Sequence, residues 1–321
     1  MIWRRSSVLK IEPIYEYLLR KQDKSTVERN QMWYEQLTPF FQDMLEVPYA
    51  VLKGDVLSIF AYGGSGFRNS HDIDILVSRK DLTKLHEICD KHDFKQIVLD
   101  DNGNPRPLSR QEKIMFKNSH QVVPYFKKLE NGTTIELDIN CDFFWAEFKG
   151  TRIKVDKILE EAIDFNLHDC HVRVLTPLTA FVQMCLHHYR EMNSIYIYKL
   201  KNPITVAMFQ DIYMFYKNHY KFNITQLLDY TKEHRIEPYM YYLLFYSNLI
   251  FEDEALSEHV ELFRTPEGEY LLNCYGLTET ERKKWKCDFI NRLNRIDLFE
   301  LVENDLNEDD KKKIELSLSI K

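Results

Sequence analysis

The spacing of hydrophobic residues changes twice along this chain of 321 residues. Residues 11–46 place apolar side chains three and four positions apart, which predicts two amphipathic helices broken near residues 23–26. Residues 47–155 carry short apolar or alternating runs typical of strands, and later residues return to helical spacing. The pattern predicts an α+β protein: N-terminal helices (1–46) packed on a mixed core (47–155), then a helical domain (156–321) with a frayed, charged C-terminal tail.

The same pattern places the individual elements. In the core we expect strands at 49–52, 71–78, 94–99, 121–130 and 133–141, with helices at 55–62 and 81–93. In the helical domain we expect helices at 156–164, 177–193, 203–219, 224–235, 238–251 and 278–299, with one short strand at 171–176.

A β-hairpin is the strongest local signal in the core. The pair Asn131-Gly132 separates two strand-like arms, and this pair is favoured at the centre of a two-residue hairpin turn. In the second arm, Glu136, Asp138 and Asn140 share one face, while apolar side chains share the other. We therefore expect one face to pack inward and the other to border a solvent-filled cleft.

Charge and composition narrow the possible partners and location. The chain has 43 Lys and Arg against 50 Asp and Glu, for a formal charge of −7, so its surface repels extended nucleic acid. A local basic pocket for one triphosphate is compatible with that total. No apolar run reaches the roughly 18 residues of a membrane-spanning helix, and the N-terminus has no signal-peptide pattern. Six cysteines without a CxxC pair indicate free thiols in a reducing compartment, so we expect a cytoplasmic protein without a membrane partner.

Two acids, Asp72 and Asp74, lie in an otherwise apolar predicted strand. Because strand side chains alternate, both carboxylates leave the same face, about 6.5–7 Å apart at the backbone. Mg²⁺ prefers oxygen ligands, and two ions about 3.5–4 Å apart clamp the attacking and leaving oxygens of an in-line displacement. Two solvated acids at a strand edge would give the same motif. The apolar strand, the Gly-rich turn before it and the later acid pair Glu136 and Asp138 favour catalysis.

Three residues are candidates for binding phosphate. Gly54 ends a predicted strand just before a helix, where backbone N–H groups attract anions. Arg68 precedes the acidic strand, and its planar guanidinium can donate paired hydrogen bonds to the oxygens of a triphosphate. Lys53 is near enough in sequence to reach the same phosphates. Each also has an ordinary interpretation: a turn glycine, a solvated loop arginine and a lysine at a strand end.

These residues resemble a known family. The stretch VLKGDVLSIFAYGGSGFRNSHDIDILV is similar to the opening of the uncharacterised nucleotidyltransferase family in the DNA polymerase beta-like superfamily. Its members carry Lys-Gly, a short helix, a loop with Tyr, an Arg and then Asp-Ile-Asp-Leu-Leu-Val. These features match Lys53, Gly54, Tyr62, Arg68 and residues 72–77. The run Ile-Glu-Leu-Asp-Ile at 135–139 is similar to the family's later acidic strand, and the resemblance extends over roughly residues 10–255.

The resemblance implies a fold, a reaction and a set of site residues. It implies a polymerase beta-like core, a mixed sheet with helices on one side, followed by a helical domain. The reaction is transfer of an NMP from an NTP such as ATP to a hydroxyl, with release of pyrophosphate. By the alignment, Asp72, Asp74 and Glu136 bind magnesium, two ions being expected, while Lys53, Gly54 and Arg68 bind the nucleotide. The residues alone leave open whether Glu136 or Asp138 is the third ligand, and both are candidate catalytic groups.

The family also bears on the acceptor. Its relatives modify antibiotics such as lincosamides and aminoglycosides, and other superfamily members act on proteins or tRNA ends. With the net charge of −7, we expect a small-molecule or a peptide or protein acceptor. His187 matches a family histidine, and Asp211 lies in a matching helix, so both are acceptor-side candidates. Packing inside helices is the ordinary interpretation of both. The oligomeric state does not follow from the sequence.

The chain departs from the family pattern at two positions. Asp55 stands where the superfamily has Ser or Gly, and its charge would repel phosphate unless the side chain points away. Asp138 replaces the family's histidine. These departures favour the alternative hypothesis of a catalytically degenerate nucleotide-binding or partner-binding module. Triphosphate binding fits both hypotheses, whereas pyrophosphate release requires an enzyme.

Overall fold

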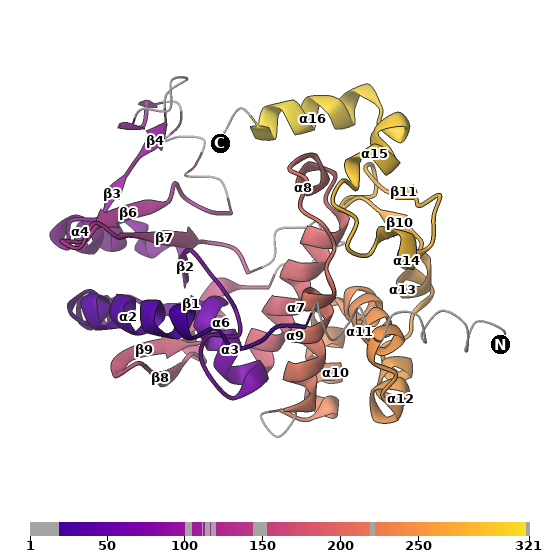
Figure 1. Ribbon diagram of the computed structural model, residues 1–321, viewed down its shortest axis with the longest axis horizontal. Helices are drawn as coiled ribbons and strands as arrows, with labels where there is room; N and C mark the ends of the chain where they lie inside the picture. Colours follow the sequence, from indigo (N-terminus) through magenta and orange to yellow (C-terminus); the bar gives the residue numbers. More distant parts are fainter. Residues whose placement is uncertain are drawn as a thin grey trace. The chain divides into compact units, whose positions relative to one another are not determined.

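The computed structural model describes residues 19–99, 105–110, 112, 116, 120–143, 153–218 and 222–318. The described residues form two compact units, one within residues 21–143 and 153–180, and one from residues 19–20 and 181–318 (Figure 1). The first unit contains the main sheet, and the second is mostly helical. The helix that the sequence predicts before residue 19 lies outside the described residues.

The sheet unit alternates helices and strands. Its elements are α2 (Lys24–Met44), β1 (Tyr49–Leu52), α3 (Gly54–Tyr62), β2 (Ile73–Val77), η2 (Arg79–Asp81), α4 (Leu82–Lys91), β3 (Lys95–Gln96), β4 (Val98–Leu99), β5 (Pro105–Arg106), β6 (Tyr125–Lys128), β7 (Thr134–Asn140), α6 (Val155–Glu160), β8 (Ile163–Leu167) and β9 (Cys170–Val174). Seven strands form a mixed sheet in the order β3-β6-β7-β2-β1-β9-β8, and β4 pairs with β5 apart from it. The pairs β2–β7 and β1–β9 are parallel, and the other pairs are antiparallel. The expected mixed α+β core is confirmed.

Helices α2 and α4 cover one face of this sheet. The ring of Phe41 in α2 stacks on that of Tyr49 in β1, with 5.9 Å between centroids. The imidazole of His92, at the end of α4, lies 2.6 Å from a carboxylate oxygen of Asp43 in α2. Tyr49 pairs with Val77 across the β1–β2 ladder, so alternate β2 residues from Val77 face α2. Asp74 therefore leaves the opposite face of the sheet.

The hairpin is confirmed, but its turn is longer than predicted. Strands β6 and β7 pair antiparallel, with Lys128 opposite Thr134. The N–H of Leu129 donates to the carbonyl of Thr133, and the N–H of Gly132 donates to the carbonyl of Leu129. Gly132 has a φ of +85°. This is a three-residue loop, a type I turn followed by a left-handed glycine, in place of the expected two-residue turn. The predicted alternation of β7 is confirmed, with apolar positions buried and acidic positions half-buried.

The segment after residue 155 differs from the predicted helix at 156–164. Helix α6 ends at Glu160, and β8 follows and pairs antiparallel with β9. The prediction was wrong here because it extended the helical spacing of α6 into β8, although Ile163, Phe165 and Leu167 alternate with polar residues as in a strand. Strand β9 confirms the strand expected at 171–176. Both strands extend the sheet. The division of the chain into N-terminal helices, a catalytic core and an acceptor-side helical domain stays a prediction.

The helical unit begins within α7. Its elements are α7 (Pro177–Asn193), α8 (Ile195–Lys199), α9 (Val206–Lys217), α10 (Ile224–Glu233), α11 (Glu237–Phe251), α12 (Glu254–Leu262), α13 (Pro266–Leu271), β10 (Cys274–Tyr275), β11 (Lys283–Lys284), α14 (Phe289–Arg292), α15 (Phe299–Val302), η4 (Glu303–Asp305) and α16 (Glu308–Leu318). Helix α11 packs against α9, α12 and α13. The four helices expected between residues 177 and 251 are confirmed within a few residues at each end.

The long helix predicted at 278–299 does not form. Gly276, at a φ of +94°, makes a tight turn in which a Cβ would approach the backbone of Glu281 to 2.5 Å. Strand β10 then pairs with β11. The rest of the predicted helix, as far as α15, forms only the short helix α14, whose last residue, Arg292, is buried. The prediction of a frayed C-terminal tail is also wrong. It forms α16, where Asp310 is 2% exposed and accepts a hydrogen bond from Lys283.

None of the helices among the described residues combines the length and the low polarity that crossing a lipid bilayer requires.

Candidate active site

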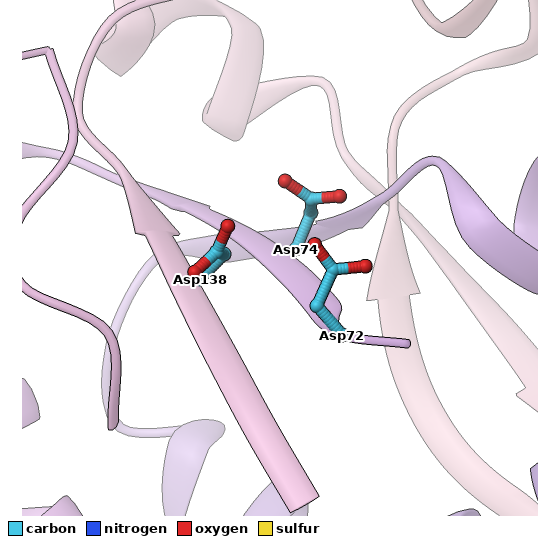
Figure 2. A group of neighbouring side chains, drawn as sticks. All are labelled: Asp72, Asp74 and Asp138. Carbon is cyan, nitrogen blue, oxygen red and sulfur yellow. The ribbon is translucent and has the colours of Figure 1, made fainter. Parts of the chain in front are cut away.

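Three aspartates converge on the face of the sheet opposite α2 and α4. Strands β2 and β7 run parallel with Asp74 in register with Asp138, and Asp72 immediately precedes β2. One carboxylate oxygen from each of Asp72, Asp74 and Asp138 lies within 4.8 Å of the other two (Figure 2). Alternation along both strands directs these side chains to the same side. The register of two adjacent parallel strands therefore builds the cluster.

The electrostatics of the cluster suit a cation. Asp74 is 4% exposed, and Asp72 and Asp138 are half-buried. Burial and the charges of Asp74, Asp72 and Glu136 raise the pKa of Asp138 to about 7. Among the described residues, the buried Oδ1 of Asp138 has no hydrogen-bond partner. Mg²⁺ in proteins takes all-oxygen donor sets that carry negative charge, and the Lys53 ammonium beside Asp74 offsets the charge of these three carboxylates only in part, so the residues fit the expected metal.

Polar neighbours orient each aspartate. The amide Nδ2 of Asn140 donates to Oδ1 of Asp74 at 3.1 Å. The hydroxyl of Ser70 donates to the carboxylate of Asp72, and the side chain of Gln121 donates to Asp138. Sequence reasoning placed Asn140 on the polar face but assigned no function to it, and it missed Ser70 and Gln121. Only the alternation of β7 carried a usable signal, because the other two residues lie in irregular segments.

Glu136 lies near the cluster but is not among the three converging carboxylates. Burial, and then the charges of Asp72 and Asp74, raise the pKa of Glu136. Glu136 lies two residues before Asp138 on the same face of β7, so the negative charges of the cluster act on its carboxylate as well. The alignment gives the third metal position to Glu136, whereas in the structure Asp138 is the acid that lies close to Asp72 and Asp74. The metal role of Glu136 stays a prediction.

Two of the phosphate-binding candidates form the turn between β1 and α3, and the third lies in the loop that follows α3. Lys53 Nζ lies 2.8 Å from Oδ1 of Asp74. Gly54 is the first residue of α3 and has a φ of +41°, which favours glycine. Arg68 is half-buried in the loop between α3 and β2. All three belong to the same unit as the aspartates, and their roles at the phosphates stay predictions.

The carboxylate of Asp55 is buried and is held by other groups of the protein. Its side chain is 2% exposed, and its Oδ2 lies 2.6 Å from Nε2 of His168. Its Oδ1 accepts a hydrogen bond from the N–H of Gly66 at 3.3 Å. Burial raises the pKa of Asp55, but hydrogen bonds from His168, Ser65 and Gly66 and the charge of His168 outweigh it, so the pKa lies below its ordinary value. This carboxylate ties the loop before β2 to α3 and to the β8–β9 turn. Sequence reasoning gave no signal for His168.

Asp55→Asn should destabilise the protein by about 1–3 kcal/mol near neutral pH, because it weakens buried charge-assisted hydrogen bonds. The folded-state pKa of Asp55 is depressed, so its stabilisation is present above the unfolded pKa of about 3.9 and is lost as pH falls through the folded pKa. Urea unfolding should show a difference from wild type that shrinks as the pH is lowered while both proteins stay folded. Asp169→Asn is the control, because Asp169 is exposed in the same turn. A difference that is constant with pH would contradict this account.

The acceptor-side candidates belong to a buried ionic cluster in the helical unit. Arg20 holds Asp211 with two contacts of 2.8 and 2.9 Å, and Asp211 is fully buried. His188 Nε2 lies 3.7 Å from Asp211, whereas His187 pairs with Glu191 at 3.3 Å. The histidine that faces Asp211 is therefore His188. The acceptor-side roles of His187 and Asp211 remain predictions.

Comparisons with protein families and with solved structures found similar proteins. The family model described as uncharacterised nucleotidyltransferase matches residues 4–252. The crystal structure of an antigenic nucleotidyltransferase-like protein from Paracoccidioides brasiliensis is similar at 14% identity and a TM-score of 0.39, over 75% of this chain and 94% of that chain. No curated protein matches the chain with significance.

The family match covers the aspartate cluster, the turn at Lys53 and Gly54, and the first half of the helical unit. It extends well beyond half of the chain. On that match, the chain belongs to the uncharacterised nucleotidyltransferase family.

Proposed function

We propose that the protein is a magnesium-dependent enzyme that transfers an NMP from an NTP to a hydroxyl of a small molecule or of a peptide or protein, and releases pyrophosphate. One observation carries the proposal: Asp72, Asp74 and Asp138 converge in a member of a nucleotidyltransferase family. Carboxylates that converge in this way suit the metal-assisted displacement at phosphorus that such a transfer requires.

The chain's own residues divide the work. Asp72, Asp74 and Asp138 would hold Mg²⁺, which when bound neutralises phosphate charge and polarises the phosphoryl oxygens. Lys53, Arg68 and the backbone at Gly54 would bind the triphosphate and fix the α-phosphorus in line with the acceptor. Glu136 then accepts the proton of the acceptor hydroxyl. The acceptor oxygen bonds to the α-phosphorus as the bond from that phosphorus to pyrophosphate breaks.

The acceptor class rests on charge. A net charge of −7 disfavours a polyanionic acceptor, so a small molecule, peptide or protein is favoured over RNA. Retention of the pure protein on heparin at physiological salt would contradict this part of the proposal. His187 and Asp211 stay the candidates for contact with the acceptor.

The non-catalytic alternative has lost one of its two supports. It rested on the charge of Asp55 and on Asp138 in place of histidine. Asp55 is engaged by His168 and Gly66, so it does not present a free charge to phosphate. Asp138 supplies the third converging oxygen, although a binding module could also keep that arrangement.

Transfer of label tests the function. The protein is incubated with each α-labelled NTP, Mg²⁺ and fractions of a cell extract, and both labelled products and pyrophosphate are measured. We expect one acceptor to gain label with an equal amount of pyrophosphate, and no transfer when the metal is chelated. Mg²⁺-dependent triphosphate binding by calorimetry without pyrophosphate release in any fraction would support a binding module instead.

A further inference from the structure

The ammonium of Lys53 is the ionic partner of a prospective metal ligand. Its Nζ lies 2.8 Å from Oδ1 of Asp74, and the Lys53 and Asp74 side chains are 17% and 5% exposed. The same oxygen accepts the hydrogen bond from Asn140. Two charges this far withdrawn from water depend on each other, because a buried charge without a partner is strongly destabilising.

Asp74 cannot serve this ammonium and a divalent cation equally well. Asp74 supplies one of the three oxygens that lie within 4.8 Å of one another. A divalent cation at those oxygens would repel an ammonium held at the same carboxylate, and the repulsion is strong where water is excluded. The two cations therefore compete for Asp74.

The backbone places Lys53 between two possible partners. Lys53 has φ 46° and ψ −143°, a conformation that residues with a Cβ rarely adopt, and Gly54 follows with φ 41°. This strained turn joins β1 to the N-terminus of α3, the nine-residue helix whose start is expected to approach phosphate. From this position the flexible lysine side chain has Asp74 on one side and, in the proposed reaction, the triphosphate on the other.

We propose that Lys53 is an exchangeable counter-ion. In the metal-free protein its ammonium neutralises Asp74. When a divalent cation binds Asp74 together with a nucleotide, the ammonium leaves the carboxylate and binds the phosphates of that nucleotide. The inference rests on the proposed function and adds a regulatory consequence. Bare metal binds weakly because it must displace the ammonium, whereas nucleotide gives the ammonium a new partner. Metal and nucleotide therefore bind with positive cooperativity, each raising the affinity for the other by the same factor.

Mn²⁺ binding tests the exchange without any turnover. Free Mn²⁺ is measured by electron paramagnetic resonance in wild type, Lys53→Met and the charge-retaining Lys53→Arg, with and without a non-hydrolysable NTP analogue. Without nucleotide, Lys53→Met should bind Mn²⁺ about tenfold or more tightly than wild type, because a competing charge is gone. With nucleotide, Lys53→Met should lose the increase in Mn²⁺ affinity that wild type and Lys53→Arg show.

The outcomes separate this inference from the function on which it rests. Equal or weaker Mn²⁺ binding by Lys53→Met would overturn the exchange and leave the enzyme proposal intact. No Mn²⁺ binding by any variant, with or without nucleotide, would overturn both.

Stability supplies a second measurement in case Lys53→Met folds poorly. Removing Lys53 leaves Asp74 buried and unpaired, so Lys53→Met should melt well below wild type and Lys53→Arg close to it. The double variant Lys53→Met/Asp74→Asn should recover most of the loss, because it removes the stranded charge as well. A double variant no more stable than Lys53→Met would overturn the pairing.

Discussion

Asp72→Asn is expected to lower the rate of NMP transfer by at least about 10³-fold while leaving the fold intact, because losing a metal ligand removes several kcal/mol of transition-state stabilisation. Asp72 precedes β2 and is half-buried, and its carboxylate accepts a hydrogen bond from the Ser70 hydroxyl. An asparagine can keep that hydrogen bond, so little stability should be lost. Pyrophosphate release and thermal unfolding, measured on the same preparation, check both halves of the prediction.

Asp90→Asn is the matched control for this variant. Asp90 lies on α4, is exposed, and pairs with Lys95 at 3.3 Å. The same chemical change on the opposite face of the sheet should leave the rate unchanged. Full activity in a double Asp72→Asn/Asp74→Asn variant would end the proposed mechanism.

Asp138→Asn should reduce transfer as severely as Asp72→Asn, by about 10³-fold, whereas Glu136→Gln, which removes the proposed proton acceptor, should cost about 10²-fold. Asp138 contributes the third oxygen of the cluster, and Glu136 does not. Both residues lie on the same face of β7 and have raised pKa values, so each is a fair control for the other. Rates with saturating Mg²⁺ and the Mg²⁺ concentration that gives half the maximal rate should both change more in Asp138→Asn.

The reverse ranking of the two variants would show that the family alignment, and not the geometry, identifies the third ligand. Glu136 would then hold the metal, and Asp138 would be the neighbouring acid. Equal losses in both would mean that the two acids share the site.

The sheet could be predicted because its strands carry the period-two signal on which such predictions rest. In β7, buried Ile135, Leu137 and Ile139 alternate with half-buried acids, and the acids fall on the face that the sequence assigned to a cleft. Asp72 and Asp74 were found for the same reason. What alternation cannot supply is register between strands distant in sequence. The pairing of Asp74 with Asp138, which favours Asp138 over Glu136, exists only in the folded sheet.

Other features were not predictable because tertiary contacts decide them. The partner of Asp55 is His168, 113 residues later, which sits in a β-turn with a φ of 48° and no sequence signature of its own. Helical spacing at 278–299 was misleading, since Gly276 and the β10–β11 pairing redirect the chain before a long helix can form. In α16, burial of Asp310 against Lys283 orders a segment whose charge pattern suggested a frayed end. In each case a distant residue outweighs the local pattern.

Crystals grown with Mn²⁺ and a non-hydrolysable NTP offer the most direct measurement of the central claim, because manganese is located by its anomalous scattering. We predict a manganese peak coordinated by carboxylate oxygens of Asp72, Asp74 and Asp138, with the triphosphate bound to the same ion. A metal bound elsewhere, or a nucleotide bound while these three carboxylates stay free of metal, would contradict the account.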